Sequence, residues 1–512
     1  MAKAKESAGR RSSARPESPK RPKRKTADSI FYELTRSMCP ICKKLIDAEI
    51  HLKDGQVIMR KRCSDHGRFE VLISPDADGY LDQLRYNKPG DIPLEFSTEI
   101  KDGCPYDCGL CPEHKQHACL VIIEVNTGCN MACPTCFMDA GTGFNLRMDE
   151  VETMLDTFVR TEGDPEVVQF SGGEPTLHPQ LLDFIKMAQD KGIRHVMVNT
   201  NGRRLVEDPA WADEFCALNP MVYLQFDGFE EETYLKMRGE SLLDEKMAAL
   251  EVLDKHNINT ILTATIERDV NEHEIPAIIK FGFKHPAVRG VMLQPVFHTG
   301  RHLEYLDPMN RVTIPELIQR ISDGMDGQIV KSDFIPVPCC HPSCQSIAYA
   351  YIEGEEVTPL ARIIDVDEYL DYITNRVWPD AEGEIREALA GMWSSSAVLG
   401  TDTMADDFVC ATCNIDFRIP SNVAKHIFAI TIKDFQDPYT FDIKKLMKCC
   451  VEIATPDGRL IPFCAYNTVG YREDVKKEIM MSRARERLQR RGNGSAAKEA
   501  AASLGDAGSD SG

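Results

Sequence analysis

Apolar runs and segments with helical periodicity alternate along the middle of the chain, from Ala118 to about Arg301. The six apolar runs are LVIIEV, EVVQF, HVMVN, MVYLQF, TILTATI and GVMLQPV, and amphipathic segments separate them. Short apolar runs that alternate with helices indicate parallel strands joined by βα crossovers. The sequence therefore predicts an α/β fold, a partial (βα)6 barrel of the TIM type, in which the C-terminal ends of the strands carry the chemistry.

Cysteine is the second informative feature, because the chain has 19 cysteines among 512 residues and most lie in short clusters with C-x2-C or C-x3-C spacing. Such clusters are typical of metal sites rather than of a secreted disulfide framework. No apolar run reaches the length of about 18 residues that a membrane helix needs. We therefore expect a cytoplasmic protein. The net charge of -20 argues against a general nucleic-acid binder.

The most specific cluster is Cys129-x3-Cys133-x2-Cys136, which directly follows the first predicted strand. Three thiolates can bind three irons of a 4Fe–4S cluster and leave the fourth iron open, which marks a catalytic centre. The second strand ends in SGGEP, where the glycines allow backbone carbonyls to approach an ammonium group and Glu174 adds charge. A structural zinc site is the alternative, but zinc sites favour C-x2-C pairs with a fourth ligand.

In Cys129, Cys133, Cys136 and the run Gly172-Gly173-Glu174-Pro175, the sequence resembles the radical S-adenosylmethionine (SAM) enzymes. The resemblance implies that SAM binds the open iron and that one electron cleaves it to methionine and a 5′-deoxyadenosyl radical, which abstracts hydrogen from an unactivated C–H bond. Thr135 stands where the family often has an aromatic residue, and Phe137 follows the third cysteine. The implied SAM-binding residues are Gly172, Gly173, Glu174, Pro175, Asn199, Gln225, Asp227 and Thr265, with Asn201 and Glu267 as further strand-end candidates. Loop capping is the alternative role for the polar residues of this set.

Three further groups of cysteines are predicted to bind metal. Cys104, Cys108, Cys111 and Cys119 are predicted to hold a closed auxiliary 4Fe–4S cluster for electron relay, with zinc, or His114 or His117 in place of one ligand, as alternatives. Near the N-terminus, Cys39, Cys42, Cys63 and His66 predict a tetrahedral mononuclear site, in which zinc is the default and a rubredoxin-like fold could hold iron. For a third cluster we expect Cys340, Cys344, Cys450 and Cys464, with Cys410 and Cys413 as the alternative pair. Cys216 is expected to be a core residue.

These features predict six segments of the chain. They are a disordered basic arm (1–28), a rubredoxin-like metal module (29–95), an auxiliary cluster loop (96–118), the barrel (119–301), a C-terminal auxiliary cluster region (302–475) and a flexible tail (476–512). The arm can rest on anionic lipid headgroups, which would give peripheral membrane contact, although a solubilising tail is the alternative.

Taken together, the metal motifs resemble the tetraether lipid synthase family over roughly residues 35 to 472. The motifs are MCPICKKL, CSDHG, GCPYDCGLCPEHKQHACLVIIEVNTGCNMACPTCF, FSGGEPTLHP, VPCCHPSC and CCVEIATPDGRLIPFCAYNTVGYR. The resemblance implies sp3–sp3 coupling of the ends of two lipid chains, with two SAM consumed per bond and an auxiliary cluster that holds the first carbon radical. It also implies three 4Fe–4S clusters and a reductant such as ferredoxin or flavodoxin.

Two other functional classes are compatible with parts of the sequence. The first is a radical SAM enzyme that modifies a peptide or small molecule, and the second is a non-enzymatic metal-binding module. For a lipid substrate, the residues that follow strands three and six offer candidates for headgroup phosphate, with solvated loop charges as the alternative. These candidates are Arg203, Arg289, His298 and Arg301.

Overall fold

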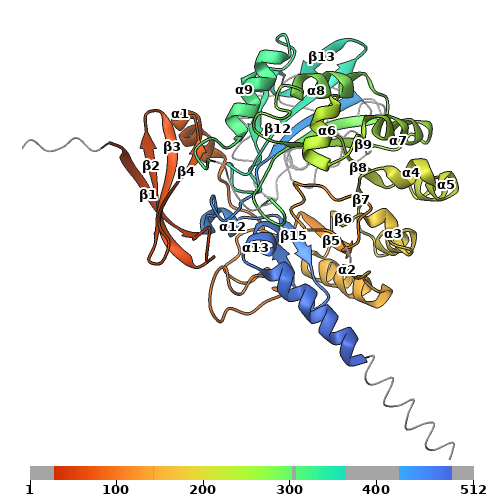
Figure 1. The fold of residues 1–512 in the computed structure, drawn as a ribbon, viewed down its shortest axis with the longest axis horizontal. Coiled ribbons are helices and arrows are strands. Elements are labelled where there is room, and N and C mark those ends of the chain that lie inside the picture. The colour runs from red at the N-terminus through yellow and green to blue at the C-terminus, as the bar shows by residue number, and fades with distance from the viewer. Residues whose placement is uncertain (1–27, 142, 303–306, 364–425, 487–512) are drawn as a thin grey trace, which may run out of the picture.

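The structure is a computed structural model that describes residues 28–486, apart from residue 142 and residues 303–306 and 364–425 (Figure 1). The predicted basic arm, the alternative ligands Cys410 and Cys413, and the tail beyond residue 486 lie outside the described residues.

The N-terminal module is a four-stranded antiparallel sheet at one side of the molecule (Figure 1). A two-residue turn at Asp54 and Gly55, both with positive φ, joins its second and third strands, as the right-handed twist of a hairpin favours. Its own small core includes Ile50, Val57 and Val71. The elements are β1 (Ile30–Met38), β2 (Leu45–Lys53), β3 (Gln56–Cys63) and β4 (Gly67–Ser74), followed by α1 (Ala77–Gln83) and the 3-10 turn η1 (Leu84–Tyr86).

The predicted partial barrel is confirmed, since the six apolar runs form neighbouring parallel strands in chain order. The amphipathic helices between them pack their apolar stripes on the sheet, as Leu181, Phe184 and Ile185 of the second crossover do. The strands are β5 (Leu120–Asn126), β6 (Val167–Gly172), β7 (His195–Thr200), β8 (Met221–Gln225), β9 (Thr260–Ile266) and β10 (Val288–Pro295). The connections contain α2 (Met148–Glu162), η2 (Pro175–Leu177), α3 (Leu181–Asp190), α4 (Arg203–Glu207), α5 (Pro209–Ala217), α6 (Glu231–Arg238), α7 (Leu243–Lys255) and α8 (Ile275–Lys284).

The C-terminal region extends the barrel sheet at both edges. Strand β14 (Ile427–Lys433) pairs in parallel with β10, and β15 (Val451–Ala454) pairs in parallel with β5. The chain thus crosses from one edge of the sheet to the other between these two strands. The remaining elements are α9 (Ile314–Gly324), η3 (Lys331–Asp333), β11 (Ile335–Pro336), β12 (Gln345–Glu353), β13 (Glu356–Pro359), η4 (Leu360–Arg362), α12 (Ile443–Leu446), β16 (Leu460–Pro462) and α13 (Phe463–Thr468). Among the described helices, none is long and apolar enough to cross a membrane.

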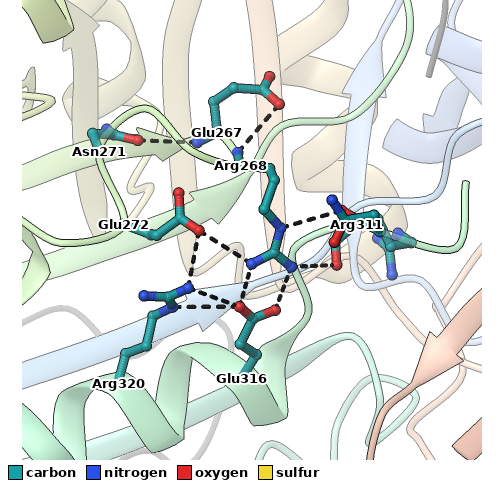
Figure 2. Close-up of polar contacts among 8 residues, drawn as sticks. Glu267, Arg268, Asn271, Glu272, Arg311, Glu316 and Arg320 are labelled. Carbon is teal, nitrogen blue, oxygen red and sulfur yellow. Dashed lines mark hydrogen bonds and ion pairs between the residues drawn. The ribbon is translucent and has the colours of Figure 1, made fainter. Parts of the chain in front are cut away.

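An ion-pair network fastens the loop after β9 to α9 (Figure 2). The Arg268 guanidinium donates to both carboxylate oxygens of Glu316, and one of its NH2 groups also donates to the Arg311 carbonyl oxygen (2.9 Å). Glu272 accepts from both Arg268 (3.1 Å) and Arg320 (3.0 Å). The network therefore fixes the loop that follows a strand end of the barrel.

Replacing Glu316 with glutamine is expected to lower the free energy of unfolding by about 1 kcal/mol, because two arginines lose their shared anion and solvent partly screens the network. Urea denaturation followed by circular dichroism measures the loss. Asp326→Asn is the control, since its pair with Lys280 is exposed and is expected to change stability by less than about 0.5 kcal/mol. An equal loss in both variants would contradict the stabilising role of the network.

Candidate functional site

The three-cysteine loop follows β5, and Cys129, Cys133 and Cys136 line one cavity of about 160 Å³. Backbone N–H groups point at two of the sulfurs, Met131 N at Cys129 Sγ and Ala140 N at Cys136 Sγ (3.4 Å each). Burial raises the pKa of the Cys129 thiol to about 11, so iron must displace its proton when a cluster binds. The donor set fits a cluster, because three thiols face a common space at the C-terminal end of a barrel strand.

The glycines after β6 allow two loops to pack against each other. A Cβ on Gly173 would lie 2.1 Å from the Gly128 carbonyl oxygen, and Gly172 has φ +133° with no room for a side chain beside Asn126. Gly173 N donates to the Asn126 carbonyl oxygen (2.9 Å), and Glu174 N donates to that of Gly128 (2.8 Å). The glycines therefore lock the loop after β6 onto the start of the three-cysteine loop.

Glu174 lines the cavity, although its side chain also joins the ends of β6 and β7. Oε1 accepts hydrogen bonds from the hydroxyls of Thr176 and Thr200 (2.6 Å each), and Oε2 accepts from Asn201 N (2.8 Å). A carboxylate held in this way cannot rotate away from the cavity, and it presents a fixed negative charge there.

The predicted strand-end residues divide into two groups. Asn199, Gln225 and Thr265 line the cavity, as do Gly172, Gly173 and the additional candidate Asn201. Asp227 does not line it: its fully buried carboxylate binds both Arg238 Nε and NH2 (2.7 Å each) and accepts from Thr265 N (3.0 Å). Pro175 begins η2 and Glu267 lies in the network of Figure 2, so neither lines the cavity.

Arg238 is a functional candidate that no sequence motif indicates. It ends α6, lines the cavity and lies beside Cys133, while Asp227 holds its guanidinium from behind. The charge of Arg238 opposes the effect of burial on the pKa of the Cys133 thiol, which is raised overall. Only the pairing with an acidic residue at the end of β8 brings this helical arginine to the site.

Four phenylalanines pack against one another as a wall, and two of them, Phe137 and Phe297, line the cavity. Phe435 and Phe463 have ring centroids 4.4 Å apart, and Phe137 and Phe297 have theirs 5.2 Å apart. All four rings line a second cavity of about 100 Å³, which also shares Ser171, Asn199, Thr263 and Gln294 with the first. Thr135, at the position where an aromatic residue is common, donates instead to the Met237 carbonyl oxygen (3.0 Å).

The four predicted ligands of the N-terminal site converge at the hairpin ends of its sheet. The ligand atoms of Cys39, Cys42, Cys63 and His66 all lie within 4.8 Å of one another. Backbone N–H groups, that of Asp65 foremost, lower the pKa of the Cys63 thiol to about 6, which favours the thiolate that zinc binds. The donor set fits a tetrahedral mononuclear zinc site.

Replacing Cys42 with alanine is expected to remove about one zinc ion per chain, because a three-ligand site binds structural zinc weakly. Inductively coupled plasma mass spectrometry of the purified variant measures the metal. Cys216→Ala serves as the control, since Cys216 is buried in α5 as expected for a core residue. Zinc retained at the wild-type level in Cys42→Ala would contradict this ligand assignment.

The structure groups the auxiliary cysteines differently from the sequence-based assignment. Cys119 lies with Cys339 and Cys450, their sulfurs within 4.8 Å of one another, and Cys340 is a hydrogen-bonding neighbour of Cys339 and Cys450. The reason is strand register: Leu120 pairs with Val451, and Leu120 N donates to the Cys450 carbonyl oxygen (3.1 Å). Cys119 is therefore brought to the C-terminal cysteines.

The other predicted ligands lie at two further places. Cys104, Cys108 and Cys111 line a small cavity together with His114. Cys464 Sγ accepts from Gln436 N (3.3 Å), and Cys344 is placed outside the group that contains Cys340 and Cys450.

The basic residues considered for headgroup binding have structural partners. Arg203 pairs with Glu240 (2.6 Å) and Glu245 (2.8 Å). Arg301 holds the three-cysteine loop, since it pairs with Asp139 (2.8 Å) and donates to the carbonyl oxygens of Cys133 (3.2 Å) and Ala140. Arg289 donates to the Asn259 side chain, and His298 is buried beside Asp437.

Comparison with known proteins finds two matching families. The radical SAM superfamily matches residues 123–282, and the HMPTM N-terminal zinc ribbon domain matches residues 31–75. A 7,8-dihydro-6-hydroxymethylpterin dimethyltransferase from Methanocaldococcus jannaschii is 33% identical over 482 residues, which cover 87% of this chain and 95% of that protein. A GTP 3′,8-cyclase from Shewanella denitrificans is 23% identical and covers 52% of this chain and 76% of its own.

Among solved structures, Streptococcus suis SuiB bound to S-adenosylmethionine matches 40% of this chain and 46% of its own at 11% identity, with a TM-score of 0.32. The family match confirms the predicted radical SAM enzyme, and with it SAM and a 4Fe–4S cluster as cofactors. The second match, over residues 31–75, confirms the N-terminal metal module as a zinc ribbon. The assignment to tetraether lipid synthase stays a prediction. On its likeness over nearly the whole length of the Methanocaldococcus protein, the chain is a radical SAM enzyme that belongs to the family of that pterin dimethyltransferase.

Proposed function

We propose that this enzyme abstracts hydrogen from unactivated sp3 carbons and joins the ends of two lipid alkyl chains. The observation that supports this proposal is the position of the four-phenylalanine wall. Phe137 and Phe297 line the same cavity as the three cysteines, and Phe435 and Phe463 continue the wall into the second cavity. An alkyl chain end has no polar atom to satisfy, so it gains by packing on these rings, and it excludes water from a radical.

Two charged side chains fit the amino-acid end of SAM. Arg238 can donate to its carboxylate through Nη1, since Asp227 binds Nε and Nη2, and Glu174 can accept hydrogen bonds from its ammonium group. Gln225 and Thr265 also line the cavity, and the Thr265 hydroxyl, which accepts from Arg238 (3.0 Å), can still donate to the ribose. The cluster supplies one electron to SAM when it is bound.

The reaction balances when each new bond consumes two SAM molecules and two electrons. Each SAM gives methionine and a 5′-deoxyadenosyl radical, and that radical takes one hydrogen atom to become 5′-deoxyadenosine. The two substrate radicals then combine to form the C–C bond. A low-potential reductant of the ferredoxin or flavodoxin class supplies the electrons. For the lipid substrate, the positive charge of the basic N-terminal arm favours approach to anionic headgroups.

We further propose that two auxiliary 4Fe–4S clusters accompany the SAM cluster. One is held by Cys119, Cys339, Cys340 and Cys450, and the other by the group of Cys104, Cys108 and Cys111. Four thiols from three chain segments provide a complete ligand set for the first. Lys433 lies beside this group. Burial lowers the pKa of its ammonium group, but the neighbouring cysteines raise that pKa by more, so the net shift is upward and the positive charge suits an anionic cluster.

A second candidate function is methyl transfer to a pterin, as the name of the Methanocaldococcus relative states for that protein. The observation that favours it is the set of amide side chains in the lining of the second cavity. Four amides that suit the donors and acceptors of a heteroaromatic ring line this cavity: Gln169, Asn199, Gln294 and Gln345.

One anaerobic assay distinguishes the two functions. Reconstituted enzyme with SAM and dithionite is given either a phospholipid with deuterated terminal methyl groups or 7,8-dihydro-6-hydroxymethylpterin, and 5′-deoxyadenosine is analysed by mass spectrometry. Lipid coupling predicts deuterium in 5′-deoxyadenosine and a product of doubled chain length. Methylated pterin without deuterium transfer from lipid would contradict the coupling and support the second candidate.

Replacing Phe435 with alanine is expected to reduce lipid-dependent deuterium transfer at least about tenfold, because the chain end loses packing beside the radical, while uncoupled SAM cleavage continues. Phe428→Ala is the control: Phe428 packs on Phe283 outside the wall, and it is fully buried whereas Phe435 is half-buried, so its loss tests the effect of a lost core ring on stability. Equal loss of transfer in both variants would indicate a general loss of stability.

A further inference from the structure

We infer that His114 is the fourth protein ligand of the cluster held by Cys104, Cys108 and Cys111. The inference rests on the proposed function in one respect, namely that these three cysteines bind a cluster. Cys119, the fourth ligand expected from the sequence, is committed elsewhere by the pairing of β5 with β15, which places its sulfur within 4.8 Å of those of Cys339 and Cys450.

The loop that carries the three cysteines is organised by contacts that do not involve the sulfurs. Asp107 Oδ2 accepts from three successive backbone N–H groups, those of Lys101, Asp102 and Gly103 (2.6 to 2.7 Å). The Tyr471 hydroxyl accepts from Cys108 N (3.0 Å) and donates to the Pro105 carbonyl oxygen (2.8 Å). Oδ2 of Asp107 is thereby occupied by the backbone of its own loop.

His114 completes the lining of the cavity that the three thiols face. It is 8% exposed, and its backbone N–H donates to the Cys111 carbonyl oxygen (2.8 Å) in a tight turn, so both residues line the cavity from one short loop. Leu446, Met447 and Pro462 close the cavity with apolar atoms. Two acidic residues also line the cavity: Asp107, described above, and Glu113, which is exposed at the surface.

The hydrogen bond of the imidazole fixes which ring nitrogen can bind metal. The Cys449 carbonyl oxygen lies 2.8 Å from His114 Nε2 and can only accept, so Nε2 carries the proton. Glu452 Oε1 also lies near Nε2, at 3.6 Å, so both neighbours of the ring face this nitrogen. In the neutral ring Nδ1 then holds a lone pair, and no hydrogen bond to Nδ1 occurs in the described part of the chain. A metal-binding histidine typically donates its second N–H to a carbonyl in this way.

A histidine ligand changes the properties of the cluster. A neutral imidazole in place of a thiolate makes the cluster less negative by one charge, and histidine ligation raises the reduction potential of iron–sulfur centres. This cluster would therefore accept electrons more readily than the all-cysteine cluster at Cys119, Cys339, Cys340 and Cys450, and the two would differ in their spectra.

Pulsed EPR of the reduced, reconstituted protein without SAM tests the ligand. Cys129, Cys133 and Cys136 are all replaced with alanine in the background protein, so that only the auxiliary clusters give a signal. We expect a strong ¹⁴N coupling from the directly bound imidazole, its loss in His114→Cys with iron retained, and a more negative midpoint potential in that variant. His117→Ala is the control and should keep the coupling, because His117 lies 3.6 Å from Cys119 Sγ.

Four outcomes overturn the inference or its basis, and they can be told apart. A coupling that persists in His114→Cys, or one that is lost in His117→Ala, excludes His114 as the ligand. A background protein with no coupling at all does the same. Cys104→Ala is expected to lose about four irons per chain. If the variant loses no iron, no cluster is bound there and the proposed cofactor content itself fails.

Discussion

Replacing Cys129 with alanine is expected to reduce formation of 5′-deoxyadenosine from SAM to the level of a control without enzyme, a loss of more than about a hundredfold. The thiol is one of only three that face the cavity where the SAM cluster is expected, so its loss leaves too few ligands. Anaerobic turnover with dithionite, followed by chromatography, measures the product.

The fold of the Cys129→Ala variant should be retained, because the loop is held by contacts that do not need this sulfur. Arg301 still pairs with Asp139, and Gly173 N still donates to the Asn126 carbonyl oxygen. Circular dichroism and the zinc content of the N-terminal site check this. Cys216→Ala, which removes a buried thiol from α5, should retain turnover. Turnover retained in Cys129→Ala would contradict the assignment of the cluster.

Replacing Arg238 with alanine is expected to have two effects of different origin. The free energy of unfolding should fall by about 3–5 kcal/mol, because the fully buried carboxylate of Asp227 loses its bidentate partner. The dissociation constant of SAM should rise at least about tenfold, because the guanidinium no longer meets the SAM carboxylate. Urea denaturation and equilibrium binding of SAM measure the two effects.

A double variant separates these effects. Asp227→Asn combined with Arg238→Met removes both charges and leaves no buried ion unpaired, so stability should recover toward the wild-type value. Binding of SAM should stay weak, since the donor is still missing. If SAM binding recovered together with stability, Arg238 would act only by supporting the fold.

The local parts of the fold were predictable from the sequence, and the long-range parts were not. Each βα unit of the barrel is encoded by neighbouring residues, so periodicity alone located all six strands. β15 has four residues and is followed by the strand β16 instead of a crossover helix. Its place beside β5 depends on pairing with residues more than 300 positions away. That pairing also decides where Cys119 goes.

The same limit applies to the candidate site. The spacing of Cys129, Cys133 and Cys136 and the glycines of SGGEP are local signals, and both lie at the cavity. Asp227 was predicted as a direct contact because it follows a strand, but the sequence cannot show that an arginine eleven residues later occupies its carboxylate. Polar strand-end residues therefore identify the neighbourhood of the site without separating contact residues from those that position them.

The insertion of β14 and β15 at opposite edges of the barrel sheet has a consequence for how the protein is made. During synthesis, β5 and β10 both leave the ribosome with an unpaired edge, and each stays open until the segment from residue 427 to residue 454 emerges. The thiols of Cys119 and Cys450 meet only in that last step. Iron–sulfur assembly at this position must therefore wait for late translation, which couples cofactor loading to completion of the sheet.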